Sequence, residues 1–266
     1  MIKLFVTDID GTLLPTGGKV SAANVQAVQK MISSGVKVVI ATGRMYSAAL
    51  TVAEQLKIPV PIICYNGALI KSSDGKILHT HFMDGKIVSQ LINFFRERGL
   101  HLQSYVDDIL YVPERNAGVE YYEDVIGVKA VEVGWDGLLE RTEGVTKLLS
   151  ISFDRDELID AMNAVRKNFG ELVEVTHSNV RFGEFMAKGV TKAGAIKILA
   201  EKFGVEISDV LAIGDSENDL PMLKAAGVGV AMGNAQPNVK DACKFITDTC
   251  ENDGFAKAVN DYVLKD

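Results

Sequence analysis

The sequence is poor in cysteine, in surplus positive charge and in long apolar runs, and each shortage excludes a class of protein. Its three cysteines, Cys64, Cys243 and Cys250, follow no disulfide or metal-ligand spacing, which favours a reducing compartment. Lys and Arg total 28 against 35 Asp and Glu, so the basic surplus typical of nucleic-acid-binding proteins is missing. No apolar stretch is long enough to span a bilayer, and the N-terminus lacks the pattern of a secretory signal. We therefore expect a cytoplasmic protein that binds neither nucleic acid nor membrane.

What the sequence does contain is an apolar run that ends in acid, residues 4–14 (LFVTDIDGTLL). An apolar run that gives way to a polar, Gly-containing turn predicts a buried strand opening into a loop. Asp8 and Asp10 stand one residue apart there, and they would repel each other unless a cation or a shared proton relieved them. The stretch therefore indicates a divalent metal, a nucleophile with its proton partner, or both.

The following residues predict a doubly wound α/β fold. A second apolar run covers 36–42 and ends in Thr-Gly-Arg, and a helical pattern over 21–34 separates it from the first. A helix over 47–56 leads to a third strand, VPIICYNGALI, which breaks at Asn66-Gly67. Strand, helix and strand with short returns form right-handed parallel units. After residue 188 the same alternation of apolar strands and helices returns.

Between these two parts the sequence pattern no longer predicts parallel strand–helix units. Residues 83–186 combine several short alternating strands with helices over about 86–98 and 158–169, which is typical of an antiparallel α+β layer. We therefore predict a core domain formed by residues 1–82 and 187–266, with an α+β domain inserted at 83–186. His177 and Arg181 lie between two late strands of this insert, where either a substrate-lining or a structural role is open.

Four short motifs lie at strand ends or at a helix start. They are Asp8 with Asp10, Thr42-Gly43-Arg44, Lys192, and GDSENDL at 214–220. In a parallel sheet the carboxyl ends of the strands share one edge, so these motifs are expected to converge. Each motif alone has a structural explanation, such as a helix cap or a solvated side chain. Their joint occurrence in this order favours a functional site.

The chemistry of these side chains indicates phosphate and magnesium. Asp8, Asp10 and Asp215 offer the hard oxygen ligands that Mg²⁺ prefers, and Asp219 could hold a metal-bound water. Donors for the oxygens of a phosphate are Thr42, the Gly43 backbone N–H, Lys192 and Asn218. Asp8 could then attack phosphorus, and Asp10 could move the proton. A calcium loop is the competing reading of DIDGT, but no third acid follows at the required spacing.

These motifs resemble those of the haloacid dehalogenase-like phosphatases. DIDGTLL, ATGR, the Lys of GVTKAGA and GDSENDLPML match the four motifs of that superfamily. CYNGALI, the position of the insert and the sequence AMGNA resemble its Cof-type subgroup, whose members are subfamily IIB phosphatases with type C2B caps. The resemblance implies a Rossmann-like core with an inserted α+β cap, a requirement for Mg²⁺, and hydrolysis of small phosphate monoesters, typically sugar phosphates, through an aspartyl-phosphate.

The resemblance also assigns roles to individual residues. It makes Asp8 the nucleophile and Asp10 the acid/base, and it places the metal on Asp8, Asp215 and the backbone carbonyl of Asp10. Phosphate would be bound by Ile9 through its backbone amide, Thr42, Gly43, Lys192 and Asn218. The carboxylate of Asp10, first considered as a metal ligand, is thereby freed for proton transfer. Apart from the resemblance, the residues expected to support the site are Asp219, Arg44 and Asn66. Because Asn66 ends a strand on the same edge, direct contact with the substrate is also open for it.

Two other functions stay open from the sequence. A phosphomutase on sugar phosphates would need several cations in the insert, and the candidates are Arg115, Lys129, Arg141, Lys147 and Arg181. A non-catalytic metabolite-binding protein is the other, although the intact acidic motifs speak against it. The oligomeric state is not indicated, and a monomer is compatible with the sequence.

Overall fold

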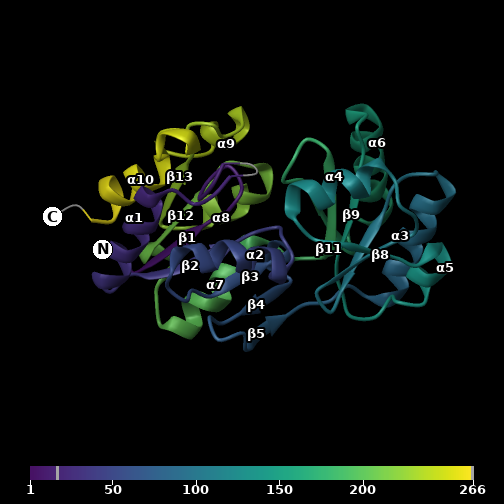
Figure 1. The fold of residues 1–266 in the computed structure, drawn as a ribbon, viewed down its shortest axis with the longest axis horizontal. Helices are drawn as coiled ribbons and strands as arrows, with labels where there is room; N and C mark the ends of the chain where they lie inside the picture. The colour runs from purple at the N-terminus through teal and green to yellow at the C-terminus, as the bar shows by residue number, and fades with distance from the viewer. Residues whose placement is uncertain (16–17, 265–266) are drawn as a thin grey trace. The chain divides into compact units, whose positions relative to one another are not determined.

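The computed structural model describes residues 1–15 and 18–264. The chain divides into two compact units, which are described separately here and can be followed in Figure 1. Unit 1 comprises Met1–His79 and Thr191–Asp266, and unit 2 comprises Thr80–Val190. The chain thus passes between units after residues 79 and 190, where the sequence suggested 82 and 186.

Unit 1 is built on an eight-stranded sheet in the order β14-β13-β12-β1-β2-β3-β4-β5. The strands are β1 (Leu4–Thr7), β2 (Lys37–Ala41), β3 (Ile62–Cys64), β4 (Leu69–Lys71), β5 (Ile77–Thr80), β12 (Val210–Gly214), β13 (Val228–Ala231) and β14 (Phe245–Ile246). From β14 to β3 all neighbours pair in parallel. The predicted α/β class with a parallel core is confirmed, but the expected third strand is a β3–β4 antiparallel pair that turns at Asn66-Gly67.

Helices flank this sheet. They are α1 (Ala22–Ser33), α2 (Tyr46–Ala53), α7 (Lys192–Phe203), α8 (Leu220–Ala225), α9 (Pro237–Asp241) and α10 (Gly254–Tyr262). Helix α1 packs against α10, and α7 packs against α8. The chain leaves β1 toward β2 but leaves β12 toward β13, in opposite directions along the sheet. Because parallel crossovers are right-handed, α1 and α8 cover opposite faces, and the sheet has its topological switch point between β1 and β12.

The local sequence explains how these elements are fixed. Ser21 caps α1 by accepting the N–H of Asn24, as expected for a helix starting there. The core is apolar, and Phe5 of β1 is fully buried. Its ring meets that of Phe255 edge to face at 5.4 Å, which joins β1 to α10.

Unit 2 contains a six-stranded sheet in the order β10-β11-β9-β6-β7-β8. Its strands are β6 (Gln103–Val106), β7 (Ile109–Val112), β8 (Ala130–Glu132), β9 (Val145–Ile151), β10 (Val173–Thr176) and β11 (Phe182–Ala187), and its helices are α3 (Gly85–Glu97), α4 (Ala117–Ile126), α5 (Gly134–Leu139) and α6 (Arg155–Phe169). The sheet is antiparallel as expected, except that β7 and β8 pair in parallel. Helix α4, which the sequence analysis did not anticipate, supplies the crossover that a parallel pair needs.

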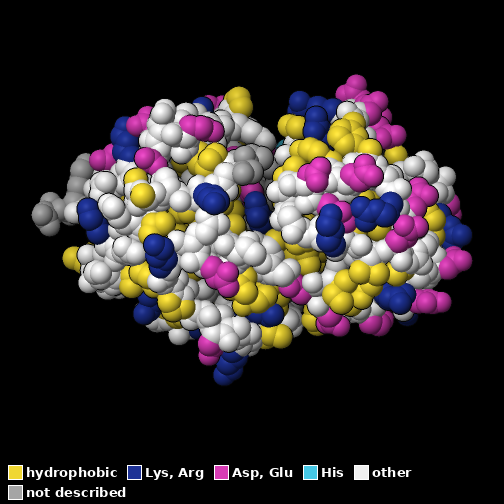
Figure 2. All heavy atoms as spheres, viewed as in Figure 1, with side chains coloured by type: hydrophobic (Ala, Val, Ile, Leu, Met, Phe, Trp, Pro, Cys, Tyr) yellow, Lys and Arg dark blue, Asp and Glu magenta, His cyan; other side chains and the backbone are white. Residues whose placement is uncertain are grey.

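The surface carries charges of both signs. On the face drawn in Figure 2, Lys and Arg side chains are interspersed with Asp and Glu over both units. Within residues 1–15 and 18–264, no helix has the length and apolar character needed to cross a membrane.

Candidate active site

Two carboxylates lie at the switch point of the unit 1 sheet. Asp8 follows β1 and Asp215 follows β12, and these strands are neighbours with Thr7 beside Ile213. The N–H of Asp8 extends the pairing by donating to the Ile213 carbonyl at 3.1 Å. Residues far apart in the sequence therefore meet at the edge where open α/β sheets bind ligands.

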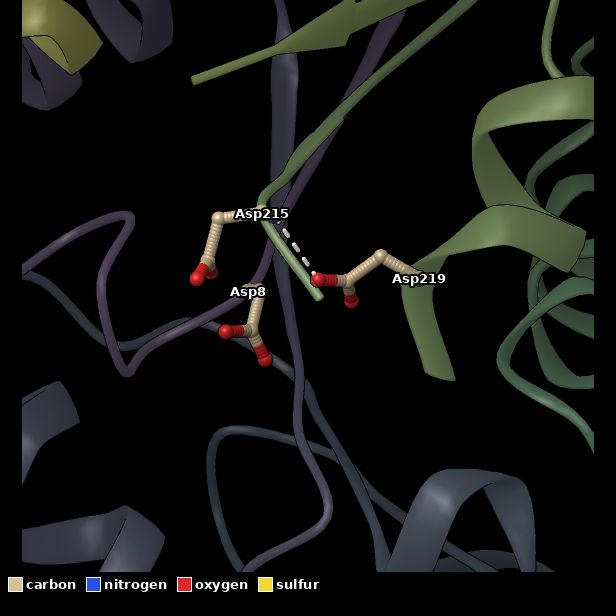
Figure 3. A group of neighbouring side chains, drawn as sticks. All are labelled: Asp8, Asp215 and Asp219. Carbon is tan, nitrogen blue, oxygen red and sulfur yellow. Dashed lines mark hydrogen bonds between the residues drawn. The ribbon is translucent and has the colours of Figure 1, made fainter. Parts of the chain in front are cut away.

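Asp219 completes a group of three carboxylates, which Figure 3 shows around the ends of the two strands. One oxygen of each of Asp8, Asp215 and Asp219 lies within 4.8 Å of the others. Asp219 also holds the loop in place, because its Oδ2 accepts the N–H of Asp215 at 2.9 Å and that of Ser216 at 3.0 Å. The expected supporting role of Asp219 thus has a structural basis in the Ser216–Asp219 capping box.

Lys192 is the cation of this cluster. It is the first residue of α7, follows the N-cap Thr191, and is fully buried. Its Nζ lies 2.6 Å from Asp8 Oδ1 and 2.6 Å from Asp219 Oδ1. Burial lowers the pKa of Lys192, but Asp219 and Asp8 outweigh burial and raise this pKa above its ordinary value. The ammonium therefore stays charged although a helix N-terminus disfavours a cation.

One ammonium does not neutralise three carboxylates. Burial raises the pKa of Asp8 well above its usual range, and Lys192 only partly opposes this effect. Burial, and then the charge of Asp219, raise the pKa of Asp215 to about 7. The surplus negative charge and the hard oxygen donors fit a divalent cation such as Mg²⁺. Because Asp219 already accepts three N–H bonds, Asp8 and Asp215 are the better placed ligands.

Thr12 is a site residue that the sequence analysis missed. Its Oγ1 donates to Asp215 Oδ1 at 3.0 Å, while the Ser216 hydroxyl donates to Oδ2 at 3.1 Å. Gly11, with φ of +74°, allows this approach, because a Cβ there would lie 2.6 Å from Asp215 Oδ2. The signal was present in the GT of DIDGTLL, directly after the two acids.

The carboxylate of Asp10 lies outside the three-carboxylate group and is bound by Arg44. The Arg44 guanidinium donates from Nε to Oδ2 at 2.8 Å and from Nη2 to Oδ1 at 2.5 Å. Arg44 is 9% exposed, so it is a buried partner and not the solvated side chain that TGR alone allowed. The side chain of Asp10 keeps intermediate exposure, at 36%.

The remaining expected residues lie in three neighbouring segments. Thr42 and Gly43 follow β2, and Asn218 belongs to the short turn before α8. Asn66, at the β3–β4 turn, connects them: its N–H donates to the Thr42 carbonyl at 3.0 Å, and its Oδ1 accepts from Asn218 Nδ2 at 3.0 Å. Ile9 is fully buried, with its carbonyl accepting N–H groups of the turn that follows.

Two candidates lie in unit 2. The guanidinium of Arg181 stacks over the rings of Tyr121 and Phe153, at 4.9 and 5.1 Å from their centroids. His177 is half-buried beyond the end of β10. These aromatic contacts of the guanidinium favour a structural role for Arg181.

Comparisons with known proteins identify this arrangement. A family model described as haloacid dehalogenase-like hydrolase matches residues 5–259. The chain is 35% identical over 273 residues to the 5-amino-6-(5-phospho-D-ribitylamino)uracil phosphatase YcsE of Bacillus subtilis, covering 99% of this chain and 96% of that relative. A solved phosphatase of the HAD superfamily from Bacteroides thetaiotaomicron is 29% identical, with a TM-score of 0.85 over 100% of this chain and 96% of the other.

A solved HAD subclass IIB sugar phosphatase shares the fold at 24% identity, with a TM-score of 0.88 over 99% of this chain and 100% of that one. The resemblance seen in the sequence motifs is thereby confirmed. The chain belongs to the haloacid dehalogenase-like hydrolase family, and within it the chain is a phosphatase.

Proposed function

We propose that the protein is a Mg²⁺-dependent phosphatase that hydrolyses phosphate monoesters of small metabolites through an aspartyl-phosphate on Asp8. The observation that carries this proposal is the pairing of Asp8 with Lys192 beside Asp215 at the sheet edge. A carboxylate held against a buried ammonium is oriented for attack, and its neighbours can receive a metal.

The metal would be held by the carboxylates of Asp8 and Asp215, with the backbone carbonyl of Asp10 as a further ligand in line with the family resemblance. When bound, Mg²⁺ offsets the negative charge of the phosphate and of the surrounding carboxylates. The phosphate oxygens would be bound by Lys192, Thr42, Asn218 and the backbone N–H groups of Ile9 and Gly43.

The chain's own residues then carry two steps. A carboxylate oxygen of Asp8 attacks phosphorus, the ester P–O bond breaks, and Asp10 gives its proton to the leaving alcohol oxygen. In the second step Asp10 takes a proton from a water, whose oxygen attacks phosphorus and releases the Asp8 carboxylate and inorganic phosphate. Arg44 sets the direction of the Asp10 carboxylate in the structure.

The substrate class is a small phosphorylated metabolite, and the sugar phosphates form its main group. The relative from Bacillus subtilis is named for 5-amino-6-(5-phospho-D-ribitylamino)uracil, a phosphorylated sugar alcohol joined to a pyrimidine. This compound therefore belongs in the first panel of substrates, together with hexose and pentose phosphates.

A phosphomutase is less favoured because the candidate cations of unit 2 already have partners there. Arg115 and Lys129 pair with Glu123, Lys147 pairs with Glu184, Arg141 donates to the Gly137 carbonyl and Arg181 stacks on two rings. A purely ligand-binding protein is less favoured because Asp8 and Lys192 form a costly buried charge cluster, which a site without turnover would not require.

Release of inorganic phosphate from a substrate panel, measured colorimetrically with MgCl₂ and with EDTA, tests the proposal. We expect Mg²⁺-dependent phosphate release that Asp8→Asn abolishes. The wild-type protein should also carry an acid-stable label after incubation with ³²P-labelled substrate and quenching with acid. Asp248→Asn, which alters an exposed ion pair, is the matched control. Full activity of Asp8→Asn would overturn the covalent mechanism, and isomerised sugar phosphate without released phosphate would favour the mutase.

A further inference from the structure

The turn between β3 and β4 has an unusual backbone. Its three residues Tyr65, Asn66 and Gly67 all have positive φ, at 51°, 56° and 119°. Two of the three carry a side chain, and L-residues rarely occupy this region unless the surrounding structure holds them there. Such strain is concentrated at functional sites, so the contacts of this turn identify what it serves.

The backbone of the turn is joined to the loop after β2. The N–H of Tyr65 donates to the Arg44 carbonyl at 3.0 Å, and the N–H of Asn66 donates to the Thr42 carbonyl at 3.0 Å. Thr42 is a proposed phosphate ligand, and Arg44 holds Asp10. The left-handed conformation therefore directs two consecutive amides at the loop that carries both residues.

The side chain of the turn holds a second phosphate ligand. Asn218 Nδ2 donates to Asn66 Oδ1 at 3.0 Å, and the two residues are 5% and 2% exposed. Among the residues that the structure describes, Asn218 Oδ1 is one of two buried side-chain polar atoms without a hydrogen-bond partner. Within the part of the chain that the structure describes, the bond to Asn66 is thus the side-chain contact that fixes the orientation of the Asn218 carboxamide. It uses one of the two N–H groups and leaves the other for an anion.

The turn also lies against the start of α7. A Cβ on Gly67 would stand 2.5 Å from the carbonyl oxygen of Thr191, the residue that precedes Lys192. The backbone of the turn can approach this closely only because residue 67 is glycine. One three-residue turn is therefore in contact with the segments that carry Thr42, Asn218 and Lys192.

We propose that Asn66 is a positioning residue for phosphate binding: it fixes the Asn218 carboxamide with an N–H toward the phosphate and ties it to the Thr42 loop. This inference rests on the proposed phosphatase function. It assigns to Asn66 no contact with the substrate, only the orientation of a residue that makes one.

Binding of inorganic phosphate, measured by calorimetry in the presence of MgCl₂, tests the proposal without requiring turnover. Asn66→Gly keeps the left-handed backbone but removes the acceptor. We expect it to weaken phosphate binding about tenfold, the loss typical of one hydrogen bond to a charged group, with little change in Tm. Asn116→Gly, which removes the side-chain cap of α4 in unit 2, is the matched Asn-to-Gly control that should leave phosphate affinity unchanged.

A double-mutant cycle separates positioning from a general structural role. If Asn66 acts through Asn218, then Asn218→Ala should lower phosphate affinity in the wild-type background but should cause no further loss in the Asn66→Gly background. Asn66→Asp tolerates the same backbone and keeps an acceptor, so in that background Asn218→Ala should lower phosphate affinity by the same factor as in the wild type. The comparison with Asn66→Asp can be made even if Asn66→Gly does not fold.

Two results would overturn the proposal: independent, multiplying losses from Asn66→Gly and Asn218→Ala, or loss of the Asn218→Ala effect in Asn66→Asp. Failure of the proposed function is distinguished from both outcomes. In that case the wild-type protein would release no phosphate from any substrate, whereas the cycle depends only on how the variants bind inorganic phosphate.

Discussion

Arg44 and Asp10 form a two-point ion pair in which each carboxylate oxygen accepts a separate guanidinium nitrogen, at 2.8 and 2.5 Å. Both residues follow strands of the same sheet, β2 and β1. A carboxylate bound at both oxygens has one orientation, and here that orientation keeps it out of the Asp8–Asp215–Asp219 group. The ion pair thus separates Asp10, the proposed acid/base, from Asp8 and Asp215, the proposed nucleophile and metal ligands.

Arg44→Lys should lower kcat about tenfold, and Arg44→Ala about a hundredfold, because positioned proton transfer typically contributes 10²–10⁴ to the rate. Lys carries the charge but cannot reproduce the planar fork. KM for a given substrate should change much less. Steady-state kinetics provide the measurement, with Arg96→Lys at an exposed ion pair of unit 2 as the control. Unchanged kcat in Arg44→Ala would show that Asp10 needs no such orientation.

Metal binding should be linked to protons at Asp215. Its pKa is raised to about 7 by burial and by Asp219, whereas an unfolded Asp has a pKa near 4. Between pH 4 and pH 7 the folded state holds a proton that the unfolded state has released. The stability of the metal-free protein therefore falls as the pH rises from about 4 to about 7. Mg²⁺ requires the deprotonated form, so its affinity should be about tenfold higher at pH 8 than at pH 6.

The measurement is the increase in Tm caused by a fixed MgCl₂ concentration at each pH, against an EDTA reference. The increase should be larger at pH 8 and should disappear in Asp215→Asn. A metal-induced increase that is the same at pH 6 and pH 8 would contradict the assignment of Asp215 as a ligand.

Lys192 should be a major determinant of stability as well as of catalysis. Lys192→Met leaves the Asp8 and Asp219 carboxylates buried without their cation, and breaking a buried pair from one side typically costs about 3–5 kcal/mol. Urea unfolding in EDTA at pH 8 measures the loss. Lys257→Met at the half-exposed pair with Asp248 should cost less than about 1 kcal/mol. Equal losses in the two variants would mean that the cluster is not held together by Lys192.

Glu123 should make the stability of the protein sensitive to acid. The Arg115 hydrogen bonds, then the Ala130 N–H and Lys129, lower its pKa to about 2. A carboxyl whose pKa is lowered in the folded state contributes its full stabilisation of the protein at pH values above its unfolded-state pKa, about 4.3 for Glu. This contribution is lost as the pH falls toward 2.

Glu123→Gln should therefore cost about 1–2 kcal/mol at pH 7, a figure reduced for the exposure of the two cations. The difference between the variant and the wild type should shrink by pH 3. Urea unfolding at both pH values tests this, with the exposed Glu97→Gln as a control. A constant difference from pH 7 to pH 3 would assign the loss to packing and not to charge.

The parallel core and the convergence of Asp8, Thr42 and Asp215 could be predicted from the sequence, because apolar runs that end in polar turns indicate strand ends, and the ends of parallel strands share an edge. The pairing of Asn66 with Asn218 could not be predicted in this way. That contact depends on consecutive left-handed residues, two of them not glycine, which no periodicity indicates. The GT of DIDGTLL marks the position of Thr12, but the hydrogen bond that gives Thr12 its role forms only once its loop folds back on Asp215.

The Thr12–Asp215 bond joins residues 203 positions apart, and β1 lies directly beside β12. The order in which a ribosome delivers the chain therefore matters. Unit 2 is contiguous and is complete at residue 190, so it can fold while β12 is still being synthesised. The apolar strand β1 therefore lacks one of its two neighbours, β12, until residues 210–214 have been synthesised. Synthesis arrested before residue 214 leaves a hydrophobic edge that chaperones and proteases can recognise.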